Sequence, residues 1–252
     1  MLMLNLVWLV PLLPLAACAV ISLGAWRNKQ ATTWISWLGI GIAWVISWGI
    51  FVVTWGKPHL AAEPFRQAIL RIPTGTKTLT LGFMVDPLTG IMLFMVPCLC
   101  LLIFVYSRGY MEGDKRYSRY FAYVSLFATG MLGLVVADNL LFLYIFWEIM
   151  GLCSYLLIAF WFERPSAYKA GLKAFLTTRI GDATLFLGLL MLYSRTGTLT
   201  FAEIFTAETL EQLAKTMVSV PLFGMVPAAT VIALLAFGGA VVGQAVGDFT
   251  WQ

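Results

Sequence analysis

The chain has 252 residues, of which 61% are hydrophobic and 11% are charged. Soluble domains carry about 25% charged residues, so this composition excludes a water-soluble globular protein. The formal net charge is +4, and the basic residues lie mostly between long uncharged runs, which indicates membrane topology and not a nucleic-acid surface.

The uncharged runs predict an all-α polytopic membrane protein with about seven transmembrane helices, since a helix needs about 20 residues to cross a bilayer. Outer-membrane strands would instead show a series of short alternating segments, whereas the uncharged stretches here are long, as in 1–26, 30–56, 87–107 and 216–247. The first run lacks a basic start and a cleavage site, so it is expected to be a retained span. The expected helices lie near residues 3–26, 31–55, 87–107, 120–138, 140–162, 171–194 and 217–247.

Two connections between these helices have structure of their own. Apolar and polar residues alternate over 68–72 and 76–81 around a Pro-Thr-Gly turn, which predicts a small β-hairpin outside the bilayer, within the connection at about 57–86. After the sixth helix, Thr200 and Glu203 fit a capping box that opens a short amphipathic helix along the membrane surface.

Lysine and arginine in the loops predict the orientation, because cytoplasmic loops are enriched in these residues. The more basic set of loops contains Arg27, Lys29, Arg108, Lys115, Arg116, Arg119, Arg164 and Lys169. The opposite set contains Lys57, Arg66, Arg71, Lys77, Arg195 and Lys215. We therefore expect the first set to be cytoplasmic, with the N-terminus and the hairpin outside.

Four ionisable residues lie inside the predicted spans: Glu148, Lys173, Arg179 and Asp182. An isolated charge at mid-membrane costs roughly 2.5 to 3.5 kcal/mol on an insertion scale, so each needs a partner or water. Arg179 and Asp182 are three residues apart and share a helix face, where Glu148 and Asp182 can compete for the arginine. Lys173, nearer the cytoplasmic end, either relays a proton or extends its amine to the interface.

The same residues allow a structural interpretation. Glu148, Arg179 and Asp182 can form a fixed ion-pair cluster that joins two helices. Asp138 and Asn139 are expected to cap a helix. The four cysteines have no metal-ligand spacing and are expected to be packed thiols, so no metal or cofactor site is predicted in this chain.

Several segments in the stretch from Asp86 to Phe205 resemble a known family. They are the residues 85–89 (Val-Asp-Pro-Leu-Thr), 117–123 (Tyr-Ser-Arg-Tyr-Phe-Ala-Tyr), 146–160 (Phe-Trp-Glu-Ile-Met-Gly-Leu-Cys-Ser-Tyr-Leu-Leu-Ile-Ala-Phe), 173–182 (Lys-Ala-Phe-Leu-Thr-Thr-Arg-Ile-Gly-Asp) and 196–199 (Thr-Gly-Thr-Leu). This ordered set resembles the chain-5-type antiporter-like membrane subunit of respiratory complex I and its photosynthetic NAD(P)H dehydrogenase relatives.

The resemblance implies an antiporter-like half-channel bundle and a role in proton translocation coupled to quinone reduction. It matches Glu148 to a buried glutamate of the family's proton path, and Arg179 and Asp182 to the pair that interacts with it. It also implies neighbouring membrane subunits as partners. NADH or ferredoxin, FMN, iron–sulfur clusters and quinone would act in other subunits, with no redox chemistry in this chain.

The resemblance divides the chain into residues 1–116, with helices one to three and the hairpin, residues 117–247, with the start of the first antiporter-like repeat, and a divergent tail at 243–252. After Val241 the family's lysine and its helix-breaking segment are missing, as is its second inverted repeat. We therefore expect the N-terminal portion of such a subunit, arising from a truncated or frameshifted gene or completed by another chain.

Two alternatives to the proton-translocating subunit remain. One is the large subunit of a multi-subunit sodium/proton antiporter, which shares the same Glu and Arg-Gly-Asp region. The other is a non-transporting structural fragment, favoured by the mismatch after Val241. The expected location is the bacterial plasma membrane, or the thylakoid membrane as the alternative.

Overall fold

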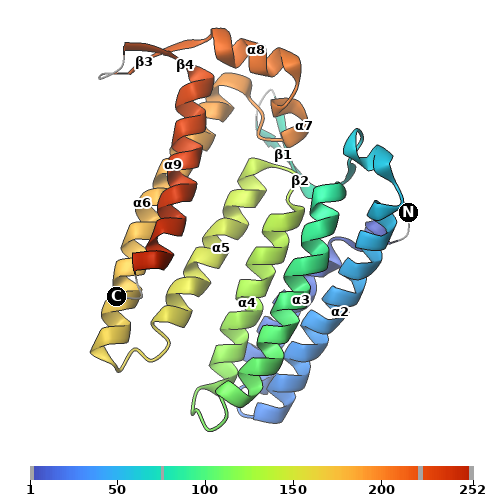
Figure 1. Ribbon diagram of the computed structural model, residues 1–252, viewed down its shortest axis with the longest axis vertical. Coiled ribbons are helices and arrows are strands. Elements are labelled where there is room, and N and C mark those ends of the chain that lie inside the picture. The colour runs from blue at the N-terminus through green and yellow to red at the C-terminus, as the bar shows by residue number, and fades with distance from the viewer. Residues whose placement is uncertain (1–2, 75–76, 221–223, 250–252) are drawn as a thin grey trace.

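In the computed structural model, which describes residues 3–74, 77–220 and 224–249, long helices run nearly side by side, with two small hairpins at one end (Figure 1). The long helices are α1 Leu9–Val20, α2 Lys29–Trp55, α3 Pro87–Tyr110, α4 Tyr117–Val136, α5 Leu140–Ile158, α6 Pro165–Thr196 and α9 Ala228–Phe249. The short helices are η1 Leu4–Leu6, η2 Ile21–Ala25, η3 Pro58–Ala61, α7 Phe201–Ile204 and α8 Ala207–Lys215. The strands are β1 Phe65–Thr74, β2 Lys77–Val85, β3 Met217–Val220 and β4 Gly224–Pro227.

The polytopic membrane architecture is confirmed. Among the described residues, six helical segments are long and apolar enough to cross a membrane, and the first of them, Leu4–Ala25, combines η1, α1 and η2. The apolar helix α9 is not one of these six; it follows them in the chain and lies alongside α6 (Figure 1).

Side-chain caps explain where several spans begin and end. Asn28 accepts bonds from the first backbone N–H groups of α2, and Asp86 accepts one from Thr89 at the start of α3. Asn139 caps α5 in the same way. Gly197 ends α6 in the left-handed region at φ 69°, where a residue without a Cβ is favoured. These polar residues interrupt an otherwise hydrophobic chain at the points where it leaves the bundle.

The predicted seventh span is wrong at its beginning. Residues 217–227 belong to the antiparallel hairpin β3–β4, in which Met217 pairs with Pro227, and the helix begins only at Ala228. Hydropathy cannot separate a short apolar strand from a helix, and Val218, Val220 and Val226 favour the extended form. Pro227 also holds the residue before it away from helical geometry.

The first hairpin is confirmed and is longer than predicted, with β1 and β2 pairing from Phe65–Val85 to Thr74–Lys77 around a bulge. Its turn at residues 75 and 76 lies outside the described part of the chain. The predicted capping box is wrong: Thr200 makes no side-chain cap bond, and the amphipathic helix is α8, which Thr206 caps.

The turn between α4 and α5 fixes the hairpin to the bundle. Asp138 accepts a bond from the backbone N–H of Gly82 at 2.9 Å, while Asn139 donates to Asp138 at 2.6 Å and to the carbonyl of Thr80 at 2.8 Å. The oxygen of Asn139 caps α5 through Phe142 N–H at 2.7 Å. The expected capping role is therefore confirmed for Asn139, whereas Asp138 holds the hairpin.

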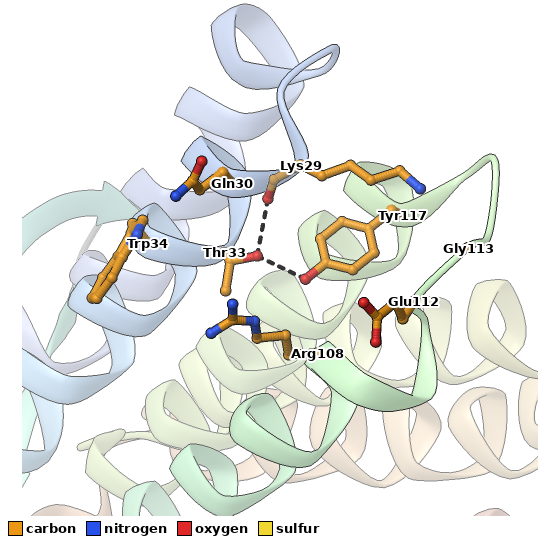
Figure 2. A pocket seen from close by; sticks show the side chains of 8 residues that line it. All are labelled: Lys29, Gln30, Thr33, Trp34, Arg108, Glu112, Gly113 and Tyr117. Atoms are coloured by element: carbon orange, nitrogen blue, oxygen red, sulfur yellow. Dashed lines mark hydrogen bonds between the residues drawn. The ribbon is translucent and has the colours of Figure 1, made fainter.

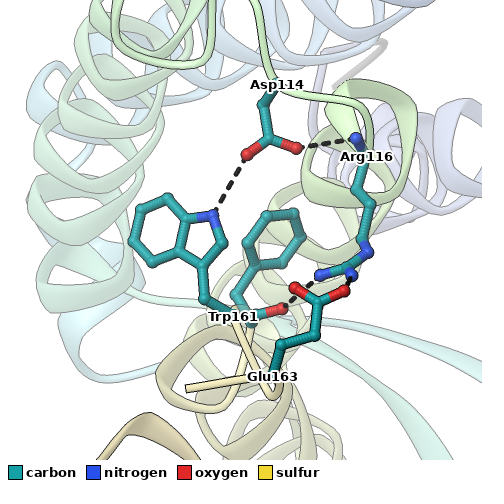
Figure 3. A network of polar contacts seen from close by, with 5 residues as sticks. Asp114, Arg116, Trp161 and Glu163 are labelled. Atoms are coloured by element: carbon teal, nitrogen blue, oxygen red, sulfur yellow. Dashed lines mark hydrogen bonds and ion pairs between the residues drawn. The ribbon is translucent and has the colours of Figure 1, made fainter.

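Polar contacts also join two loops at the opposite end of the bundle (Figure 3). Asp114 accepts bonds from the indole of Trp161 at 3.1 Å and from the backbone N–H of Arg116 at 2.7 Å. Arg116 forms an ion pair with Glu163 and donates to the carbonyl of Phe160 at 3.4 Å. The α3–α4 and α5–α6 loops are thus tied together, which fixes the ends of the two helices that form the charged cluster described next.

Candidate functional site: a charged cluster between α5 and α6

Arg179 lies between two carboxylates from neighbouring membrane spans. It forms an ion pair with Glu148 of α5, and the same nitrogen, Nη1, lies 3.7 Å from an oxygen of Asp182 on its own helix. Arg179 is the cation at ion-pair distance from both acids in the described structure, so its guanidinium is the counter-charge for each of them. The sequence-based expectation that these three residues meet is what the structure shows.

Burial differs among the three side chains. Asp182 is 4% exposed, Glu148 is 23% exposed and Arg179 is 34% exposed. An ionised carboxylate removed from water needs strong partners, because its desolvation costs several kcal/mol. Asp182 is therefore the acid most dependent on its neighbours, and Glu148 is the more accessible one.

Trp147 supplies the second partner of Asp182 and was missed by sequence reasoning. Its indole Nε1 donates to Asp182 Oδ1 at 2.9 Å across the α5–α6 interface. A half-buried indole N–H in a membrane helix usually finds an acceptor, and this residue precedes Glu148 directly, so the signal was present. Asp182 thereby has one oxygen bound to Trp147 and the other facing Arg179.

The guanidinium of Arg179 also lies over an aromatic ring. Its Cζ is 4.8 Å from the ring centre of Phe175, one helical turn earlier, and Phe175 packs against Tyr155 of α5 at 5.1 Å. The Nε of Arg179 is buried without a hydrogen-bond partner in the described structure. Arg179 is thus held by the ion pair at Nη1 and by the ring of Phe175, and not through a full set of hydrogen bonds.

Lys173 does not join the cluster. It precedes Arg179 by six positions, which at about 100° per residue places it on a different face of α6. Its side chain is exposed, and within the described residues no carboxylate lies at ion-pair distance from it. This position favours the interpretation in which the amine of Lys173 extends to the membrane surface over the one in which it relays a proton to Glu148.

The cluster contains two carboxylates and one guanidinium, so with all three ionised it carries one net negative charge. A net charge inside a bilayer is unfavourable, and binding one proton would remove it. Among the described residues, no group of three or more His, Cys, Asp or Glu side chains could hold a metal ion. The arrangement can therefore exchange a proton between carboxylates that share a single cation.

This fold, with an arginine held between carboxylates of two apolar spans, is of the antiporter-like membrane class. Two family models match the chain: "NADH-Ubiquinone oxidoreductase (complex I), chain 5 N-terminus" over residues 72–121 and "NADH:quinone oxidoreductase/Mrp antiporter, TM" over residues 137–238. The second match includes Glu148, Arg179 and Asp182. The chain belongs to the family of chain-5-type antiporter-like membrane subunits.

Similar proteins come from chloroplasts and cyanobacteria. The chain is 43% identical over 205 residues to the chloroplastic NAD(P)H-quinone oxidoreductase subunit 5 of Chlorokybus atmophyticus, which covers 78% of this chain and 30% of that protein. It is 40% identical over 244 residues to NAD(P)H-quinone oxidoreductase chain 5 of Synechocystis sp., covering 94% of this chain and 34% of that protein. The chain thus spans about a third of the length of these relatives.

Solved structures share the fold. A chain of an archaeal membrane-bound sulfane sulfur reductase matches 98% of this chain with a TM-score of 0.75 and 16% identity, over 47% of its own length. A chain of the Mrp complex from Dietzia sp. matches 94% of this chain with a TM-score of 0.63 and 22% identity, over 23% of its own length. Both matches establish the helical arrangement alone.

Proposed function

We propose that the chain is the N-terminal portion of a proton-translocating membrane subunit of an NAD(P)H-quinone oxidoreductase-type complex. The observation that supports this most directly is the shared cation: Arg179 Nη1 faces Glu148 of α5 and Asp182 of α6 inside the membrane-spanning part of the bundle. A fixed structural pair needs only one acid, whereas two acids around one arginine permit a change of partner.

In the proposed mechanism, Glu148 accepts and releases the proton. While Arg179 is paired with Glu148, the positive charge stabilises the ionised glutamate. When Arg179 turns toward Asp182, Glu148 loses its counter-charge and a proton neutralises it. Trp147 keeps its hydrogen bond to Asp182, so the aspartate stays in place as the alternative partner.

The wider assembly belongs to the same proposal. Electrons from NADH or ferredoxin would reach quinone through FMN and iron–sulfur clusters in other subunits, and quinone reduction would bias the position of Arg179 through neighbouring membrane subunits. Helix α5 is poorly buried, since only Phe146 and Cys153 of its residues are fully covered, and it therefore offers these partners a surface. The plasma or thylakoid membrane is the proposed location, with the N-terminus outside.

The test is Glu148→Gln in the complete complex, with donor-driven proton pumping and electron transfer measured in the same vesicles. We expect fewer protons pumped per electron because glutamine cannot carry a proton. The matched control is Glu208→Gln, which removes an exposed carboxylate on α8 and should leave the ratio unchanged. An unchanged ratio in Glu148→Gln would refute the role of this residue.

A sodium/proton antiporter subunit is the second candidate, favoured by the family model, which also describes Mrp antiporters, and by the similarity to the Mrp complex. Transport in membrane vesicles separates the two functions. Proton movement that requires sodium and ignores respiratory electron donors would favour the antiporter, whereas donor-dependent movement without sodium supports the main proposal.

A further inference from the structure

A charged cavity lies at the end of the bundle that also contains the α3–α4 loop. Its volume is about 300 Å³, and it is formed by the start of α2, the end of α3 and the start of α4 (Figure 2). Because it lies where three spans leave the bundle, its depth corresponds to the headgroup region of a bilayer. The charged cluster around Arg179 is on other helices, so this cavity is a separate site.

The floor of the cavity is made of two buried hydroxyl groups whose protons are already used. Thr33 donates to the carbonyl of Lys29 at 2.9 Å and lies 2.7 Å from the hydroxyl of Tyr117 (Figure 2). Since the single proton of Thr33 goes to the carbonyl, Tyr117 must be the donor between the two hydroxyls. Neither hydroxyl has a proton left for a ligand, so the side-chain donors that remain for an anion are the cations and the amide of Gln30.

Two cations that form no ion pair among the described residues line the cavity, and the charge of Lys29 helps to lower the pKa of the neighbouring Asp114. Lys29 donates to the carbonyl of Asp114 at 2.9 Å and lies over the ring of Tyr117, and Arg108 lies over the ring of Trp37. Across the described residues, neither forms an ion pair with an acid. Each therefore keeps N–H donors for an anion, and these charge-assisted bonds are the strong class.

Glu112 also lines the cavity, and it limits the charge that the cavity accepts. With Lys29 and Arg108 it gives one net positive charge. A phosphodiester carries one negative charge and neutralises this set, whereas a second negative charge on the ligand would face Glu112 without compensation. The cavity thus matches a headgroup with one net negative charge, and not a zwitterionic headgroup whose phosphodiester is balanced by its own ammonium group.

An exposed apolar stripe begins at the cavity wall. Trp34 lines the cavity, and along the same face of α2 the large exposed side chains continue with Leu38, Ile42 and Val45. Their spacing of four, four and three residues keeps them in one line along the helix. A ligand whose phosphate sits between the cations can therefore extend a hydrocarbon chain along α2, and the tryptophan lies where membrane proteins place interfacial aromatic residues.

We propose that this cavity binds the headgroup of a singly charged anionic phospholipid, with Lys29 and Arg108 on its phosphate, Glu112 rejecting more highly charged headgroups and the stripe from Trp34 receiving an acyl chain. Basic pockets between spans are suited to anionic headgroups. A free phosphate ion would use the cations but not the stripe.

The test is native mass spectrometry of the full chain in detergent, titrated with phosphatidylglycerol and, separately, with phosphatidylethanolamine of the same acyl chains. Phosphatidylglycerol should bind more tightly than phosphatidylethanolamine. Arg108→Gln should weaken phosphatidylglycerol binding roughly tenfold, as expected for the loss of one charge-assisted contact. The matched control is Arg164→Gln, because Arg164 is also exposed at this end and lies over a tryptophan, Trp161, but outside the cavity.

A second variant guards against misfolding. Glu112→Gln removes the repulsive charge, so it should strengthen phosphatidylglycerol binding severalfold, which a damaged protein would not show. Three results would overturn the proposal: equal binding of the two lipids, equal weakening by Arg108→Gln and Arg164→Gln, or displacement of the lipid by millimolar inorganic phosphate. The last result would assign the cavity to a free anion.

Discussion

At the residue scale, Asp182 combines the deepest burial in the charged cluster with the most specific partner. Its two oxygens face different helices, one toward Trp147 of α5 and one toward Arg179 of its own helix. The indole N–H is a neutral donor that stays in place whichever acid the arginine faces. In the proposed mechanism, Trp147 therefore holds the aspartate in position and carries no charge itself.

The substitution Trp147→Phe tests this role. It keeps an aromatic ring and removes the N–H, leaving a buried acceptor with one partner fewer, so unfolding should become easier by about 1 to 3 kcal/mol. Detergent unfolding of the purified chain measures the change. Trp48→Phe, at an exposed ring on α2, should cost much less; equal costs would show that the Trp147 bond contributes nothing specific.

Asp138 predicts a pH dependence at the hairpin end. Burial raises the pKa of Asp138, more than its bonds from Asn139 and Gly82 lower it. The folded state then binds the proton more tightly than the unfolded state, so this contribution to stability is present below the ordinary aspartate pKa of about 3.9 and is lost as the pH rises through the folded value.

The substitution Asp138→Asn should remove that component and flatten the stability curve in this range, as measured by thermal unfolding at a series of pH values. Asp114 makes stability depend on pH in the opposite direction, because the backbone N–H of Arg116 lowers the pKa of Asp114. Asp114→Asn should therefore remove a component that is present above the ordinary value and lost as the pH falls. Parallel changes in the two variants would contradict the assignment.

At the element scale, the sequence was informative about spans and less so about connections. Long, mostly apolar runs place the six spans within about six residues of their observed ends, because only a helix satisfies its own backbone in lipid. The β3–β4 hairpin was missed because its apolar residues continue directly into α9. The bonds of Asp138 to Gly82 could not be foreseen either, since they join residues 56 positions apart.

The docking of the first hairpin depends on a glycine. A Cβ on Gly82 would lie 2.5 Å from Asp138 Oδ2 and 2.5 Å from the carbonyl of Gln67, both closer than real contacts allow. We expect Gly82→Ala to separate the hairpin from the α4–α5 turn at a cost on the order of 2 kcal/mol, typical of overpacking. Faster hydrogen exchange in β1 and β2 measures it.

The control for this prediction is Gly41→Ala in α2, where an added Cβ meets nothing within 4 Å. That change should be neutral or slightly stabilising, because alanine favours helices over glycine. Hairpin exchange as slow in Gly82→Ala as in Gly41→Ala would mean that the turn is not what holds the hairpin.

At the scale of the whole molecule, the meeting of Glu148, Arg179 and Asp182 was predictable because few charges occur in the spans and each needs a partner. Lys173 lies apart from these three residues because it is on another face of α6, and this could be deduced from the six positions between Lys173 and Arg179 in the sequence. Trp147 was not predicted, although its position directly before Glu148 was a signal for it. The Lys29–Arg108 cavity was not predicted because it requires three helix ends to converge.

The position of Arg179 Nη1 between Glu148 and Asp182 also bears on how fast the arginine can change its partner. Because Nη1 already lies near both acids, a change of partner needs rotation within one side chain and no displacement of α5 or α6. Side-chain rotations are far faster than the microsecond-to-millisecond motions of whole domains. In a working complex this exchange would follow its driving event almost at once, so the waiting time of each cycle would be set elsewhere.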